Sequence, residues 1–204
     1  MKKILFGIMA LSMAAFGATT TNPGTVSGET ETASVPVTVI AELIKAPTGL
    51  TITNDAGTVL DELVIDHGRM VIGKATDDSV AFEFFKVQRF EDKDSSIENS
   101  DLITDNQNNL HVSLTNPVTT LTNTSDKTAS LTSTLSLTGG ANASNLTSYN
   151  HAVATGDKVH IGRVISRITK DSLNAKTNKV GIHHNRAEAD RPVLTVTLKA
   201  NTTK

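Results

Sequence analysis

Residues 33–43 read Ala-Ser-Val-Pro-Val-Thr-Val-Ile-Ala-Glu-Leu, with an apolar residue at every second position. Successive side chains of a β-strand point to opposite faces, so this alternation predicts a strand with one apolar face. Pro36 lies on the opposite face and removes one backbone donor, which an edge or inserted strand tolerates better than a central strand. We therefore expect a strand at a boundary, packed on its own domain or on a neighbouring molecule. The side chains that would share its packed face are Val35, Val37, Val39, Ala41 and Leu43.

Residues 1–17 have the layout of a secretory signal: two lysines, an apolar run and then small residues. Ala15 and Gly17 fit the small residues that precede a cleavage site, so we expect cleavage after Gly17. A membrane anchor is the alternative, but the apolar run is shorter than the roughly 20 residues that span a bilayer. We expect an exported mature chain without a membrane span.

Loss of that segment removes Lys2 and Lys3 and leaves 17 basic and 21 acidic residues, a net charge of −4. Nucleic-acid affinity depends mainly on cationic contacts to phosphate, so this charge argues against a nucleic-acid partner. The chain has no cysteine, which excludes disulfides and thiol chemistry. The roughly 187 residues that remain favour one domain.

Threonine and valine are abundant and aromatic residues make up only 3% of the chain, so the composition indicates an all-β protein. Disorder is the competing reading, but apolar alternation recurs from residue 33 to the C-terminus. Residues 18–32 are nearly free of apolar side chains and are expected to be a flexible leader. The predicted order is leader, an N-terminal strand at 33–44 and a β-domain at 45–204.

Alternation within that domain predicts strands at 49–53, 58–65, 80–90, 110–114, 131–137, 158–168 and 193–200. The phase of the alternation changes near Phe84 and Phe85, which predicts a bulge or bend there. Stretches without a sustained period are expected to be loops or excursions, at 91–109, 116–127, 139–155 and 173–190. Seven to nine half-apolar strands are usually buried as two packed antiparallel sheets, so we predict an immunoglobulin-like β-sandwich.

The sequence holds no motif of a known nucleophile, phosphate or dinucleotide site, and we expect no enzyme, cofactor or metal. His183 and His184 lie near two acids, but adjacent residues of an extended chain point apart, which favours a solvated loop over a metal pair. Residues 92–98 carry alternating oxygen donors but lack the glycine of a calcium loop, which favours a plain acidic loop. His67, His111, His151 and His160 are scattered one to a segment and are interpreted as ordinary packed or surface residues.

Three stretches carry a resemblance to a known family: 32–43, 50–53 and 192–200. With the signal segment and the cysteine-free, threonine-rich domain, they resemble the subunits of chaperone–usher pili (fimbriae). The likeness is to the alternative group that includes colonisation-factor pilins and capsule-forming fibre subunits. That resemblance implies a sandwich that lacks its last strand and is completed by a strand donated from the next subunit.

The resemblance further implies that Val35, Val37, Val39, Ala41 and Leu43 enter a groove of a neighbouring subunit. It implies identical subunits, a periplasmic chaperone and an outer-membrane usher as partners. The chain would pass through the periplasm to the cell surface and serve as a structural fibre subunit with a role in adhesion. A self-contained secreted sandwich that binds carbohydrate or protein is the alternative, although few aromatic residues are present to bind sugars. A secreted hydrolase is a third, more distant possibility.

Overall fold

The computed structural model describes residues 21–27, 30–34, 49–93, 96–103, 107–138, 146–186, 189 and 191–199. The chain divides into two units, Met1–Lys45 and Ala46–Lys204, and each is described by itself. The expected signal segment 1–17 lies outside the described residues. So do the side chains proposed to enter a neighbour, which are Val35, Val37, Val39, Ala41 and Leu43.

The described residues of the first unit form one antiparallel strand pair, β1 (Thr21–Ser27) and β2 (Thr30–Ser34). The register places Thr25 opposite Thr32, with an irregularity before Thr25. This pairing differs from the expectation that residues 18–32 lack regular structure. Threonine is β-branched and favours extended backbone even where no apolar alternation marks a strand.

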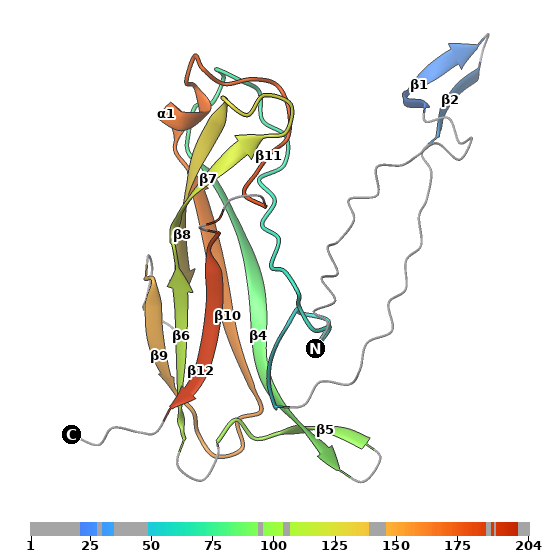
Figure 1. The fold of residues 1–204 in the computed structure, drawn as a ribbon. Helices are drawn as coiled ribbons and strands as arrows, with labels where there is room; N and C mark the ends of the chain where they lie inside the picture. The colour runs from blue at the N-terminus through green and yellow to red at the C-terminus, as the bar shows by residue number, and fades with distance from the viewer. Residues whose placement is uncertain are drawn as a thin grey trace, which may run out of the picture. The chain divides into compact units, whose positions relative to one another are not determined.

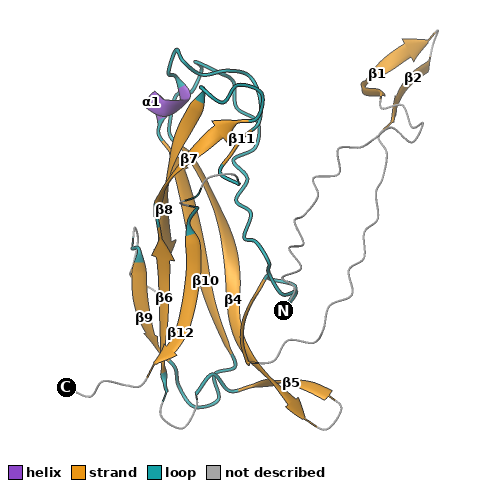
Figure 2. Ribbon diagram, in the orientation of Figure 1, coloured by secondary structure: helices purple, strands orange, loops and turns teal. Residues whose placement is uncertain are grey.

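The second unit contains ten strands and one short helix among its described residues. They are β3 (Gly49–Thr53), β4 (Ser79–Lys93), β5 (Ser96–Ser100), β6 (Asn109–Thr115), β7 (Val118–Asn123), β8 (Ser130–Thr138), β9 (Ser148–Ala152), β10 (Val159–Ile168), α1 (Lys170–Leu173), β11 (His183–His184) and β12 (Val193–Lys199). All paired strands are antiparallel. Figure 2 shows how strands dominate this unit.

Two sheets form the predicted antiparallel β-sandwich (Figure 1). The larger has the order β11-β7-β8-β10-β4-β3, with β5 added to the end of β4, and the smaller has the order β12-β6-β9. Their facing sides bury a shared apolar core because inward and outward residues alternate along each strand. The fully buried side chains of this core are Phe85, Val87, Leu102, Leu110, Val112, Leu137 and Val164.

The predicted bulge in β4 is wrong. β4 and β10 pair in continuous register from Ser79 opposite Ile168 to Gln88 opposite Val159. Phe85 is buried in the core, whereas Phe82 and Phe84 lie on the outer face and are about half exposed. The apolar phase changes because both faces of this strand carry large apolar side chains.

The strand predicted at 58–65 is also wrong, because only Val59 bridges to Thr53 and no ladder follows. This segment nevertheless lies against the core through Leu63 and Ile65. Acidic residues at 61 and 62 interrupt its alternation, and its backbone crosses the edge of the sandwich without joining either sheet.

Four strands lie in stretches predicted to be loops: β5, β7, β9 and β11. None shows clear apolar alternation in its own sequence, and each is specified by pairing with a neighbour: β4, β8, β6 and β7, respectively. Asn116 adopts a positive φ of 48°, which Asn tolerates better than most residues, and this permits the tight connection from β6 to β7.

Candidate functional site

The last strand of the sandwich, β12, lies at the edge of the smaller sheet. All seven of its residues pair with β6, from Val193 opposite Thr115 to Lys199 opposite Asn109. Within the part of the chain that the structure describes, no strand pairs with its other side. Antiparallel pairing uses the backbone groups of alternate residues on each side, so this edge can accept hydrogen bonds from a further strand.

The inward face of β12 carries three aliphatic side chains, Leu194, Val196 and Leu198. They pack against the buried core, yet each remains partly exposed. The equivalent inward residues of the central strand β6, Leu110 and Val112, are fully buried. The core is therefore incompletely covered on the outer side of β12.

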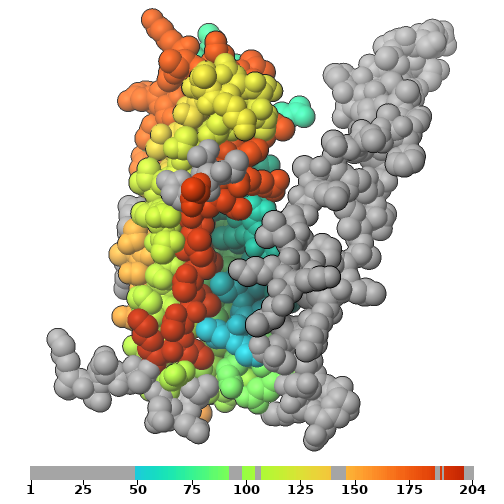
Figure 3. Space-filling view, viewed as in Figure 1, coloured from blue at the N-terminus to red at the C-terminus, as the bar shows by residue number. Residues whose placement is uncertain are grey.

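A cavity of about 430 Å³ lies beside the start of β12, where Leu194 lines it and Val196 and Leu198 do not. Leu194 forms one wall, Ile52 of β3 belongs to the other, and Val164 of β10 lies at its base. Its further apolar lining is Leu60, Leu63, Ile65, Leu114, Leu135, Pro192 and Val193. We call this cavity, with the inward side chains of β12, the β12 groove. Figure 3 shows the red surface of β12 beside the cyan surface of β3 and the residues that follow it.

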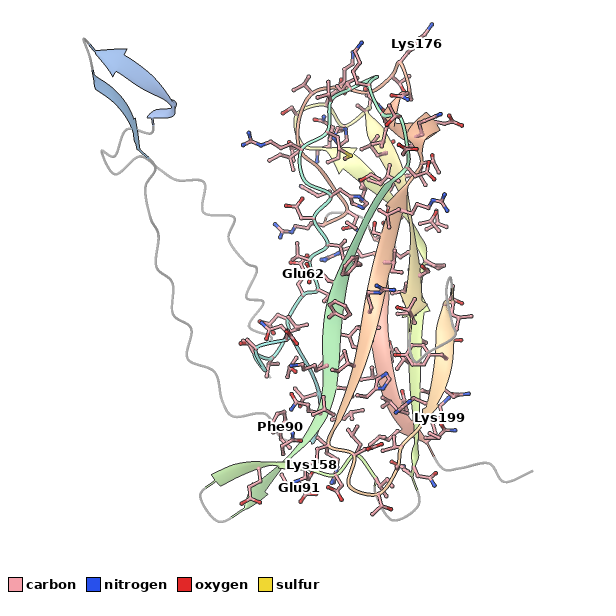
Figure 4. The ribbon with its side chains drawn as sticks, turned by 180° about the vertical axis from the view of Figure 1, so that it is seen from behind. Glu62, Phe90, Glu91, Lys158, Lys176 and Lys199 are labelled. Atoms are coloured by element: carbon pink, nitrogen blue, oxygen red, sulfur yellow. The ribbon has the colours of Figure 1, made fainter. Side chains whose placement is uncertain are left out.

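Ion pairs cross one end of the β12 groove, next to the start of β12. Glu62 Oε1 lies 2.7 Å from Arg191 Nη2 and 3.5 Å from Arg186 Nε. Glu62 is labelled in Figure 4 on the irregular segment that borders the groove. Such partly exposed pairs contribute about 0–1 kcal/mol, so their main effect is to link the two walls at this end.

A chain of polar side chains anchors the wall formed by residues 58–67. His67 bonds through Nδ1 to Ser79 Oγ and through Nε2 to Ser166 Oγ, both at 2.8 Å. Ser166 Oγ in turn lies 2.6 Å from Ser133 Oγ. Burial lowers the pKa of His67, opposed by the charge of Asp66. This arrangement holds the segment on three strands: β4 through Ser79, β10 through Ser166 and β8 through Ser133.

A second buried polar pair lies inside the core, away from the groove. The hydroxyl of Tyr149 is 2.8 Å from Nε2 of His160, and the His151 ring centroid lies 4.3 Å from that of His160. Burial, and secondarily the charge of His151, lowers the pKa of His160 to about 4. Burial raises the pKa of Tyr149 to about 12. Both groups are therefore neutral at neutral pH and act as a packed hydrogen-bonded pair.

The residues weighed as possible metal ligands lie in strands. His183 and His184 form β11, opposite Asn123 and Thr122 of β7, instead of the expected loop. In the acidic stretch 92–98, the described residues 92, 93 and 96–98 belong to the pairing of β4 with β5, which corrects the loop predicted there. Across the described ranges, no group of three or more His, Cys, Asp or Glu side chains could hold a metal ion.

Sequence reasoning predicted the strand β12 but missed the groove beside it. No period in the sequence marks the groove, because the apolar alternation in 193–199 does not show whether a further strand covers those residues. Among the described residues, no helix is of a length and apolarity that would let it span a bilayer. No protein-family model matches this chain, and no curated protein matches its sequence.

Proposed function

We propose that this chain is a structural subunit of a bacterial surface fibre, assembled when the strand at 33–43 of one copy enters the β12 groove of the next. The observation that carries this proposal is that, among the residues the structure describes, no strand pairs with the outer edge of β12, which borders an apolar cavity at its start. On its own, an exported β-sandwich with both features leaves backbone groups of an edge strand unpaired and apolar side chains exposed to water. Both features favour pairing with a strand of another chain.

Apolar side chains recur with the same spacing in β12 and in the strand at 33–43. Leu194, Val196 and Leu198 lie at every second position of β12, and so do Val35, Val37, Val39, Ala41 and Leu43 of the entering strand. Two residues of a strand advance the chain by about 6.6 Å, so a strand laid along β12 presents its apolar side chains in step with those of the groove. Pro36 would face away from the core and cost one hydrogen bond at most.

The free energy available from this insertion is large. Complete burial of a valine or leucine side chain contributes about 1.5–3 kcal/mol, and burial of the five apolar side chains of the strand would offset a large part of the about 1–2 kcal/mol that ordering each residue costs. Backbone hydrogen bonds along β12 add specificity for an extended strand. We infer a polymer of identical subunits that resists detergent and heat.

Assembly of such a fibre requires other partners before the groove is filled. A subunit with an open groove would aggregate during export, so a periplasmic chaperone that lends a strand and an outer-membrane usher that releases the fibre complete the proposal. The finished fibre would lie on the cell surface, where adhesion is its proposed role.

The test is polymerisation of the exported chain with Val37→Asp and Val39→Asp together. We expect loss of the detergent-resistant ladder on unheated gels, because two carboxylates cannot be buried in the apolar groove without several kcal/mol of desolvation. The matched control is Thr38→Asp, which places the same charge on the outward face and should leave the ladder intact. A ladder that persists in the double variant would contradict the proposal, and a wild-type chain that stays monomeric would favour a self-contained binding module.

A further inference from the structure

Two loops at one end of the sandwich expose apolar side chains. Figure 1 places α1 and its flanking loops at the end of the unit opposite to β5. The first loop presents Val71, which is 73% exposed, between the partly exposed Met70 and Ile72. The second presents Val180 and Ile182, which are 88% and 71% exposed.

These loops are joined to each other by a reciprocal amide contact. The side chain of Asn174 accepts a hydrogen bond from Ala75 N at 3.0 Å and donates one to Ala75 O at 2.9 Å. The first loop also closes on itself through a bond from Lys74 N to Val71 O at 3.3 Å. The two sets of apolar side chains therefore belong to a single end surface.

The exposure of Val180 and Ile182 is built into the fold. Nδ2 of the fully buried Asn123 donates to the carbonyl oxygens of Lys179 and Val180, while Oδ1 accepts from Ser125 N and Asp126 N. Gly181 adopts a φ of 145°, and a Cβ at that position would lie 2.8 Å from the Asn123 amide. The loop is held by a buried anchor that turns its two β-branched residues outward.

The same two loops are basic. Residues 68–76 and 172–182 contain Arg69, Lys74, Lys176 and Lys179 and no acidic residue, although the mature chain as a whole is acidic. Figure 4 shows Lys176 extending outward at this end. Of the nearby acids, Asp78 binds Arg167 and Lys170 N, and Asp126 binds Thr128 and also interacts with the charge of Lys179. Asp77 and Asp171 flank the loops, and the four basic side chains of the loops outnumber these two acids and Asp126.

We propose that this end surface, formed by Arg69, Met70, Val71, Ile72, Lys74, Lys176, Lys179, Val180 and Ile182, binds a membrane rich in anionic lipids. Apolar side chains on projecting loops can enter the boundary between headgroups and acyl chains, while adjacent lysine and arginine side chains contact lipid phosphates. A protein partner would need a pocket complementary to two separate loops, whereas a lipid surface adapts to them. This proposal does not depend on strand donation.

The experiment uses the absence of cysteine from the chain. The full chain with Val180→Cys carries an environment-sensitive fluorophore and is mixed with vesicles of phosphatidylglycerol and phosphatidylcholine, or of phosphatidylcholine alone. We expect a blue shift with the anionic vesicles only, weakened at high salt because screening reduces the attraction. The matched control is Ile161→Cys on the outer face of β10, also apolar and 54% exposed, which should give no shift.

Co-sedimentation with the same vesicles provides the second measurement. Lys176→Gln combined with Lys179→Gln should reduce the partition coefficient about tenfold or more, at roughly 1 kcal/mol per cation, while Lys158→Gln at the opposite end should not. Equal binding of anionic and neutral vesicles, an equal shift at residue 161, or unchanged binding of the lysine variant would overturn the proposal. Failure of the wild-type chain to bind any vesicle would also overturn it, and a patch-dependent association between chains would then assign the surface to a protein contact.

Discussion

At the scale of single residues, the sandwich contains titratable groups that are held neutral by burial. His160 lies in the core against Tyr149, and its pKa falls from 6.5 to about 4. His67 is half-buried between two serine hydroxyls, and its pKa is lowered in the same direction. Both histidines bind a proton more readily in the unfolded chain than in the folded one.

The free energy of unfolding should therefore fall on mild acidification. Above pH 6.5 His160 is neutral in both states; as the pH drops from 6.5 to about 4, the unfolded chain takes up a proton that the folded chain does not. The expected loss from His160 is on the order of 3 kcal/mol, measured by urea unfolding at pH 7 and pH 4. His160→Gln should remove most of that dependence and leave the smaller part due to His67. A wild-type chain equally stable at both pH values would contradict this account.

At the scale of elements, Gly162 of β10 lies close to Phe85, its partner on the adjacent strand β4, and to Tyr149 on β9 of the opposite sheet. A Cβ on Gly162 would lie 2.3 Å from Cζ of Phe85 and 2.7 Å from the Tyr149 hydroxyl. The Phe85 ring and the Tyr149 hydroxyl occupy the space that a side chain at 162 would need. This contact is a condition for the two sheets to share one core.

Gly162→Ala should lower the free energy of unfolding by about 1–3 kcal/mol, because an added methyl in a close-packed core displaces an aromatic ring. Urea denaturation followed by circular dichroism would measure it. The matched control is Thr132→Ala on the exposed face of β8, for which the change should stay within about 0.5 kcal/mol. If Gly162→Ala proved as stable as the wild type, the tight packing of β10 on Phe85 would be refuted.

The elements also show what the sequence could predict. Strands with clean alternation on one face, such as β6, β8 and β12, were found close to where they were predicted. β7 and β9 were missed because pairing with β8 and β6 specifies them, and pairing partners leave no period in a single segment. The segment at 58–65 was predicted to be a strand because its apolar residues alternate; Leu63 and Ile65 do pack on the core, but the backbone forms no ladder with either sheet.

The groove was beyond sequence reasoning for a similar reason. Alternation identifies which side chains of β12 face inward, but it does not reveal whether a further strand covers them. The apolar face of 33–43 predicted a strand that could enter a groove, and the edge of β12 presents apolar side chains with the same spacing. The cavity beside β12 could be identified only from the structure, which places β3 and residues 58–65 against the smaller sheet.

At the scale of the whole molecule, the account rests on whether the strand at 33–43 fills a groove in another copy. The absence of cysteine allows a direct measurement: Val39→Cys and Val196→Cys are introduced together, and the chain is oxidised during export. Facing residues of adjacent strands have Cβ atoms about 4.5–5.5 Å apart, which is close enough for a disulfide to form. Val35→Cys or Val37→Cys, each combined with Val196→Cys, tests the other registers in which the strand could pair with β12.

Strand donation predicts a ladder of disulfide-linked subunits on non-reducing gels of fully denatured protein, collapsing to a single band on reduction. Thr38→Cys with Val196→Cys, which directs the first thiol away from the core, should give no such ladder. A monomer with an internal disulfide, seen as a single faster band, would show that the chain fills its own groove and would contradict the account.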